Sequence, residues 1–150
     1  MKIAASNKKA FFNYEIVESL EAGIALVGSE VKSIRGGRVS LKDSFAEIKN
    51  GEVFLLHMNI SPYEQANIFN HDPLREKKLL LHRQEIKRLI GKIREKGYTL
   101  VPTKVFFNDK GKVKVEISLA KGKRTYEKKR AIKERELDRE VRAELKRRHR

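Results

Sequence analysis

The chain of 150 residues is predicted to form a mainly β domain with added α-helix, on the basis of three features of its sequence. Short runs rich in β-branched and aromatic residues recur along the chain and are separated by turn residues. Only one stretch, about 82–96, has the periodicity of a long amphipathic helix. Strands and helices do not alternate, which argues against a parallel βαβ sheet. Together these features predict a small antiparallel barrel.

The N-terminal region begins with small and polar residues, and we expect 1–10 to be a flexible arm. Residues 11–20, FFNYEIVESL, predict a strand because aromatic and β-branched residues dominate. Residues 21–23 are interpreted as a turn, followed by a second short strand over 24–27.

A short helix is predicted over about 29–35. Ser29 is a suitable N-cap, and Gly36-Gly37 are suited to end the helix.

Residues 44–58 predict a β-hairpin, because Asn50-Gly51 is a strong two-residue turn signal between two apolar runs. The phase of Phe45 and Ile48 differs by one residue, so a β-bulge is one interpretation of the first strand. Residues 59–76 predict a long loop, and loops of that length in compact domains are usually functional.

The long helix is predicted from about 82 to 96, with KKLLL before it as an extended lead-in and Gly97 as its C-terminal stop. Two more strands, 98–107 and 112–120, flank the turn NDKG. In the second of these strands apolar residues alternate with polar ones, which predicts a half-buried antiparallel strand.

About six strands and two helices in some 110 residues favour an OB-like six-stranded antiparallel barrel over 1–120. The remainder, 121–150, is a basic tail in which fourteen residues are Lys or Arg and six are Asp or Glu. Leu137, Val141 and Leu145 form only a thin apolar stripe, so we expect the tail to be disordered or loosely helical alone and to fold against a polyanion. The alternative is a solvated helix that lies on its own domain.

The net charge of +15 and a pI near 10.1 favour a polyanionic partner. Anionic lipid is the competing partner, but the tail has no Trp or Phe to insert into a membrane interface. The sequence has no run of eighteen apolar residues and no secretory signal at its start, so we expect a cytoplasmic protein without a membrane partner.

Candidate catalytic and metal-binding groups are sparse. Cysteine is absent and the four histidines lack ligand spacing, so we predict no metal site and no cofactor. Asp43 and Glu47 are too few for a two-metal nuclease, and His71-Asp72 has no oriented nucleophile beside it. We predict no catalytic residues and no enzymatic activity.

The basic positions are more informative. Lys112 and Lys114 share the outer face of a strand that leads into Lys121, Lys123 and Arg124, a line of charge suited to a phosphate backbone. The alternative is that these lysines only protect an exposed strand from aggregation.

Tyr14 and Tyr126 are suited to stacking on bases. For Tyr14, a place in the hydrophobic core is the simpler interpretation.

Four segments carry a resemblance to a known family: EAGIALVGSEVKSIRGG (21–37), SLKDSFAEIKNGEVFLLHMNISPYEQAN (40–67), HDPLREKKLLLHRQEI (71–86) and AKGKRTYEKKRAIKERE (120–136). In this order, and over nearly the whole chain, they resemble the small protein B family, the SsrA-binding proteins of bacterial trans-translation. The resemblance implies an OB-like barrel that binds the tRNA-like domain of transfer-messenger RNA. It also implies delivery of that RNA to stalled ribosomes, with elongation factor Tu as an indirect partner through the RNA.

The resemblance also implies the RNA-contacting residues. On the barrel these are Tyr14, Glu21, Leu80, His82 and Lys114, and the AKGKR segment adds Lys121, Gly122 and Lys123. The tail would enter the ribosomal decoding centre and the vacant message channel as a helix, with Tyr126, Lys128, Lys129, Arg130 and Leu137 as contacts.

Two other functions remain as alternatives at this point. A general OB-fold RNA-binding or ribosomal protein would show no preference for the tRNA-like domain. A nuclease acting on structured RNA would require a carboxylate or histidine cluster that the sequence does not contain.

Overall fold

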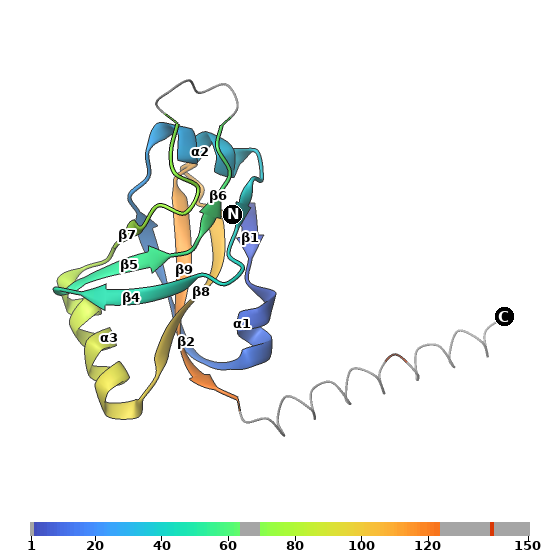
Figure 1. Ribbon diagram of the computed structural model, residues 1–150. Helices are drawn as coiled ribbons and strands as arrows, with labels where there is room; N and C mark the ends of the chain where they lie inside the picture. The colour runs from blue at the N-terminus through green and yellow to red at the C-terminus, as the bar shows by residue number, and fades with distance from the viewer. Residues whose placement is uncertain (1, 64–69, 124–138, 140–150) are drawn as a thin grey trace.

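A computed structural model describes residues 2–63 and 70–123, together with residue 139 alone. Within them are nine strands and three helices (Figure 1). In chain order these are β1 (Lys2–Ser6), α1 (Lys8–Asn13), β2 (Tyr14–Ile24), α2 (Gly28–Arg35), β3 (Val39–Ser40), β4 (Phe45–Lys49), β5 (Glu52–Leu56), β6 (Asn59–Ile60), β7 (Lys77–Leu80), α3 (Arg83–Lys96), β8 (Thr99–Phe107) and β9 (Val113–Gly122).

The main sheet has seven strands in the order β1-β8-β9-β2-β7-β5-β4, and every pair in it is antiparallel. A second, two-stranded sheet pairs β3 with β6. The hydrogen-bonded order of the described strands runs from β1 to β4, and β4 also comes back against β8, so the sheet is strongly curled. The predicted mainly antiparallel, OB-like class is confirmed, whereas the main sheet has one strand more than the six expected.

The N-terminal region differs from the predicted flexible arm. Residues 2–6 form an edge strand on β8, and residues 8–13 form helix α1 with Asn7 as its N-cap, so residues 11–13 are helix and not the expected strand. The backbone N–H of Asn7 donates to Thr103 O at 2.8 Å, and its side chain donates to Pro102 O at 2.9 Å. These partners lie almost a hundred residues away, so no local pattern indicates them.

Strand β2 begins and ends later than the predicted strand over 11–20. Residues 21–23 do not turn but continue the strand, pairing in order with Glu116, Val115 and Lys114 of β9. The separate strand expected over 24–27 is absent, because β2 ends at Ile24. A glycine inside a strand can be a place of close approach rather than a turn.

Helix α2 begins after Val27, not at a Ser29 cap. The carboxylate of Glu30 accepts the Val27 backbone N–H at 2.9 Å, and Ser29 instead bonds His71.

The hairpin of β4 and β5 has the predicted turn, with Asn50 and Gly51 both at positive φ (52° and 73°). Its register is continuous from Phe45↔Leu56 to Lys49↔Glu52, so the suggested bulge is absent from this pair. Phe45 and Ile48 differ in phase for another reason, which is that they lie on opposite faces of β4. Ala46 and Ile48 face the core, whereas Phe45 faces outward and is 42% exposed.

The predicted long helix is confirmed as α3, with His82 as N-cap and Gly97 (φ 67°) as the left-handed C-terminal residue. Within the lead-in KKLLL, residues Lys77–Leu80 form β7.

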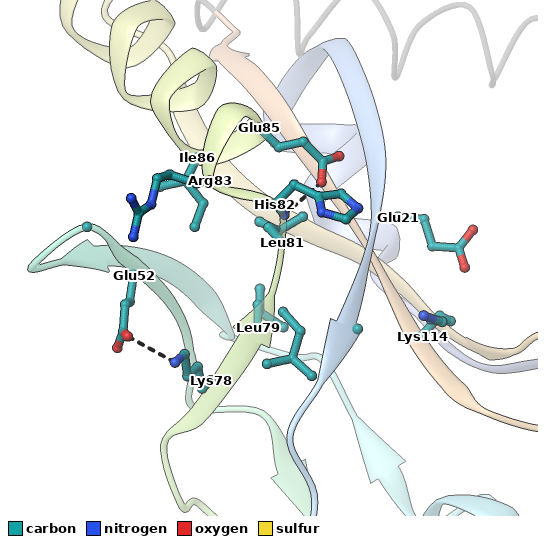
Figure 2. A pocket seen from close by; sticks show the side chains of 13 residues that line it. Glu21, Glu52, Lys78, Leu79, Leu81, His82, Arg83, Glu85, Ile86 and Lys114 are labelled. Carbon is teal, nitrogen blue, oxygen red and sulfur yellow. Dashed lines mark hydrogen bonds and ion pairs between the residues drawn. The ribbon is translucent and has the colours of Figure 1, made fainter.

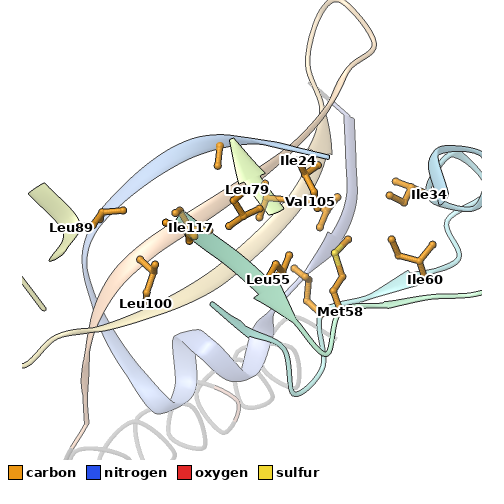
Figure 3. Close-up of a cluster of buried hydrophobic side chains, with 14 of the residues drawn as sticks. Ile24, Ile34, Leu55, Met58, Ile60, Leu79, Leu89, Leu100, Val105 and Ile117 are labelled. Atoms are coloured by element: carbon orange, nitrogen blue, oxygen red, sulfur yellow. The ribbon is translucent and has the colours of Figure 1, made fainter. Parts of the chain in front are cut away.

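The hydrophobic core lies inside the curled sheet. Figure 3 shows Leu89 of α3 at one end of this core and Ile34 of α2 at the other, with Leu55, Leu79 and Ile117 between them. The two helices therefore close the two ends of the sheet. On β9, Val115, Ile117 and Leu119 face inward as predicted, but Ser118 and Ala120 are also fully buried. Ala10 of α1 packs against Ala120, and the Ser118 hydroxyl lies against those of Ser19 and Thr103.

Candidate nucleic-acid interface

One open cleft of about 650 Å³ lies where β2, β7, β9 and the start of α3 meet (Figure 2); we refer to it as the β2–α3 cleft. Four predicted RNA-contacting residues line it: Glu21 from β2, Leu80 from β7, His82 at the N-cap of α3 and Lys114 from β9. These residues lie up to 93 positions apart in the chain. The fold therefore gathers them on one surface.

The β2–β9 register brings Glu21 and Lys114 together. Glu21 pairs with Glu116 and Gly23 pairs with Lys114, so Glu21 and Lys114 are diagonal neighbours on one face of the sheet. Figure 2 shows both side chains on the same side of the cleft. Neither side chain has a hydrogen bond or ion pair within the described part of the chain.

Glu116, by contrast, is occupied. Its carboxylate accepts the Thr103 hydroxyl at 3.0 Å and lies 3.5 Å from Lys104 Nζ. Of the two opposed glutamates, only Glu21 is left available to a ligand.

Leu80 is 52% exposed, although it lies in the middle of this surface. It pairs with Gly23 across the β2–β7 ladder. A Cβ at position 23 would lie 3.2 Å from Leu80 Cβ, so glycine provides the space in which the leucine side chain rests on β2. Gly23 is a site-shaping residue that sequence reasoning missed, because we interpreted it as part of a turn.

His82 is placed by the start of α3. Its backbone is extended and its N–H donates to Glu85 Oε1 at 2.9 Å, as in one half of a capping box. The His82 side chain is exposed and lines the cleft.

Arg83, the next residue, lines the same cleft, is exposed and has no partner among the described residues. A cation in the first turn of a helix is electrostatically unfavourable, which is the signal that could have identified it.

The opposite side of the cleft carries a surface ion pair. Lys78 Nζ lies 2.9 Å from Glu52 Oε1, and the dashed line in Figure 2 marks this contact. Both side chains are nearly half exposed, so the pair contributes little to stability and can open to a ligand.

Lys112 lines an adjoining cleft of about 410 Å³ with apolar walls that include Leu26 and Val31. Leu80 and Lys114 border both clefts. The fold thus brings five of the predicted residues onto one continuous surface.

The remaining described candidates lie at the other end of the β2–β9 ladder. Tyr14 pairs with Gly122, and Glu15 pairs with Lys121. Lys123 donates its backbone N–H to Asn13 O and its ammonium to Phe11 O, both at 3.0 Å. Nine residues of strand separate Tyr14 from Gly23, roughly 30 Å along the chain. The structure therefore divides the predicted residues into two groups.

The other predicted contacts lie outside the described residues. They are Arg124, Tyr126, Lys128, Lys129, Arg130 and Leu137.

Helix α3 is held against β2 by Glu18. Its carboxylate contacts Arg88 and accepts Lys92 Nζ at 2.9 Å. The hydrogen bond from Lys92, reinforced by both positive charges, lowers the pKa of Glu18 although burial opposes the shift. This clamp fixes the helix whose N-terminus presents His82.

A buried ionic cluster of Glu30, Arg75 and Lys77 anchors α2 to the start of β7. Arg75 reaches both oxygens of Glu30, at 2.6 and 3.2 Å, and Lys77 Nζ donates to Arg75 O at 2.6 Å and to Met58 O at 3.0 Å. Burial alone would raise the pKa of Glu30, but the hydrogen bonds from Arg75 and the Val27 N–H outweigh it, so the pKa lies below its ordinary value. Burial lowers the pKa of Lys77.

His71 has a structural role in this arrangement. Its ring lies 2.8 Å from both the Ser29 hydroxyl and Ile60 O. The carbonyl can only accept, so Nε2 carries a proton and donates to it.

Among the described residues there is no group of three or more His, Cys, Asp or Glu side chains that could hold a metal ion. The helices within these ranges are all too short or too polar to cross a membrane.

The chain is similar to known proteins over most of its length. The model of the family described as SmpB protein matches residues 4–147. An SsrA-binding protein of Symbiobacterium thermophilum is 62% identical over 137 residues, 91% of this chain and 87% of the relative. An SsrA-binding protein of Thermosipho africanus is 55% identical over 147 residues, 98% of this chain and 99% of the relative.

A solved structure described as "tmRNA-SmpB: a journey to the center of the bacterial ribosome" contains a chain that is 50% identical to this one. The two superpose with a TM-score of 0.66, covering 80% of this chain and 84% of the other. On these matches, the chain belongs to the SmpB protein family.

Proposed function

We propose that this protein binds the tRNA-like domain of transfer-messenger RNA and delivers that RNA to stalled ribosomes in trans-translation. The role is that of an RNA-binding protein and requires no catalytic group and no cofactor. Bacterial ribosomes occupy the cytoplasm, so the protein would act there, with elongation factor Tu as an indirect partner through the RNA.

The observation that supports this proposal best is the meeting of Glu21, Leu80, His82 and Lys114 in the β2–α3 cleft. These side chains offer a hydrogen-bond acceptor, an exposed apolar surface, a ring and a cation within one surface. Such a mixture suits structured RNA, in which bases as well as phosphates are accessible. A surface that bound only phosphate would need cations alone.

The second group, Tyr14, Lys121, Gly122 and Lys123, would bind a different part of the assembly. It adjoins the start of the basic tail, which we propose enters the decoding centre and the vacant message channel as a helix. Two RNA partners, transfer-messenger RNA and the ribosome, account for two separated groups.

The first test is binding of the tRNA-like domain at increasing salt, with ordinary tRNA as competitor. We expect Glu21→Ala and Lys114→Ala each to weaken binding to the tRNA-like domain by at least about tenfold, since hydrogen bonds to charged groups contribute about 1.5–3 kcal/mol and each 1.4 kcal/mol is about tenfold. Preference for the tRNA-like domain should persist at high salt in the wild type, because shape and base contacts do not depend on counterion release.

Glu15→Ala serves as a matched control, because Glu15 is an exposed carboxylate on the same strand that lies outside the β2–α3 cleft. Equal affinity for tRNA and the tRNA-like domain, with both lost steeply as salt rises, would contradict the proposal.

The tail is tested separately. A chain ending at residue 120 should retain much of its binding to the tRNA-like domain but fail to support peptide tagging on stalled ribosomes. Full tagging by this truncated chain would refute the role proposed for the tail.

A further inference from the structure

Another cleft, of about 310 Å³, lies between α1, the start of β4 and the start of β8. Its lining is largely polar and includes two aromatic residues, Tyr14 and Phe45. Six side chains carry the inference: Lys9, Asn13, Tyr14, Asp43, Phe45 and Thr99. We refer to it as the Phe45 cleft.

Phe45 is the central feature of this cleft. Phe45 is 42% exposed as a residue, and its ring stacks on the His57 ring, with 5.3 Å between centroids and 26° between planes. His57 thus supports one face of the phenyl ring, while the ring also lines the cleft. An exposed ring held in a fixed orientation is a stacking platform for a flat ligand.

The backbone on both sides of this platform is strained. Asp43 (φ 63°) precedes Phe45 by two residues, and His57 (φ 60°) follows Leu56, the cross-strand partner of Phe45. Within the described chain only one other non-glycine residue, Asn50 in the hairpin turn, has positive φ. Left-handed backbone at non-glycine residues is costly and tends to be retained at functional sites.

The polar side chains of the cleft are available. Lys9, the Asn13 amide, the Tyr14 hydroxyl, Asp43 and Thr99 have no side-chain hydrogen bond or ion pair within the described part of the chain. An amide, a hydroxyl and a carboxylate can read the edge of a base, and a lysine can hold the adjoining phosphate. The cleft also adjoins Gly122, which pairs with Tyr14 immediately before the basic tail.

We propose that the Phe45 cleft binds one unpaired nucleobase of RNA, stacked on Phe45 with its edge toward Asn13 and Asp43 and its phosphate near Lys9. The inference rests on the proposed function in taking RNA as the partner. It concerns a different site, because Tyr14 and Glu21 are seven residues apart on β2, roughly 23 Å. An RNA held in the β2–α3 cleft leaves this second site open to another unpaired base.

The test uses the full chain and two single-stranded RNAs of about seven nucleotides. One carries the fluorescent adenine analogue 2-aminopurine at its centre, and the other is abasic at that position. Both RNAs carry the same phosphates, so basic residues of the protein, including those of the tail, attract them equally. The ratio of the two affinities therefore measures the contribution of the central base. We expect the wild type to bind the base-containing RNA about tenfold more tightly, with quenched fluorescence, as base–aromatic stacking implies.

Phe45→Leu keeps an apolar side chain but removes the ring, and it should bring the affinity ratio close to one. Phe45→Tyr should retain the ratio. Phe11→Ala is the matched control, because Phe11 is 51% exposed on α1 but does not line the cleft, and its ratio should equal that of the wild type.

A ratio near one in the wild type, or an unchanged ratio in Phe45→Leu, would overturn the proposal. Its failure is separable from failure of the proposed function. Phe45→Leu should bind the isolated tRNA-like domain as the wild type does, whereas Glu21→Ala should lose that binding and keep the base preference at Phe45.

Discussion

The β2–α3 cleft and the buried ionic cluster both contain charged side chains, but they use charge in opposite ways. In the cluster, Glu30 is fully buried and both of its oxygens are bonded, and the Lys77 ammonium has two carbonyl partners. In the cleft, Glu21 and Lys114 are accessible and have no partner within the described chain. A charge that is fully satisfied internally contributes to the fold, whereas an accessible charge without a partner is available to a ligand.

The same contrast exists between two adjacent leucines of β7. Leu79 is 1% exposed and belongs to the core, whereas Leu80 is 52% exposed and borders both the β2–α3 cleft and the adjoining cleft. Because side chains alternate along a strand, one residue of displacement changes the role of a leucine completely.

The largest expected effect separates these two leucines. Leu79→Ala should lower the free energy of unfolding by roughly 2–5 kcal/mol, since it leaves a cavity in the core. Leu80→Ala should change it by less than about 1 kcal/mol but weaken binding to the tRNA-like domain. Urea unfolding and RNA titration of both variants test this, and a strongly destabilised Leu80→Ala with normal affinity per folded molecule would remove Leu80 from the site.

Glu30→Ala should produce a somewhat smaller loss of stability, about 2 kcal/mol, because Arg75 and Lys77 would keep their charges without the shared carboxylate. Arg75 is partly exposed and can rehydrate, which limits the loss. Affinity for RNA, measured per folded molecule, should remain near that of the wild type. Glu47→Ala, which removes an exposed partner of Lys49, is the control and should unfold like the wild type. An equally stable Glu30→Ala would show that the cluster does not support the fold.

The smallest expected effect is the pH dependence of the same carboxylate. The pKa of Glu30 is lowered from its ordinary value of 4.5, so the unfolded chain holds the proton more tightly than the folded one. The stabilisation is therefore complete above about pH 4.5 and is lost as the pH falls through the lower folded pKa. Unfolding free energies between about pH 3 and 7 should fall less steeply on acidification in Glu30→Gln than in the wild type. Parallel curves for the two proteins would rule out this linkage. Glu18, whose pKa is also lowered, retains its own contribution in both proteins.

Local features of the sequence are sufficient to predict several elements. The 3.6-residue periodicity and Gly97 give α3, Asn50-Gly51 gives the β4–β5 hairpin, and alternation over 113–119 gives β9. Each of these signals depends on residues close together in the chain, so each can be recognised without knowing which distant segments pack against it.

The N-terminal strand and helix could not be predicted in this way. Residues 2–10 have weak local preferences, and the aromatic residues at 11 and 12 favoured a strand where a helix forms. This region is ordered by β8 and by Asn7 contacts to Pro102 and Thr103. Gly23 was open to a second interpretation for a related reason. A glycine after two small or polar residues resembles a turn, and only its partners Lys114 and Leu80 make it part of a strand.

The sequence by itself determined the chemical inventory of this protein: its strong positive charge, its lack of cysteine, its main amphipathic segments and its family. Tertiary structure alone decided which charges are paired and which are available. Glu21 and Glu30 are the same residue type. Glu30 bonds Arg75, 45 positions away in the chain, whereas Glu21 has no partner in the described chain. Pairing of this kind depends on contacts between distant segments, and those contacts exist only after the sheet has curled and α2 and α3 have closed its ends.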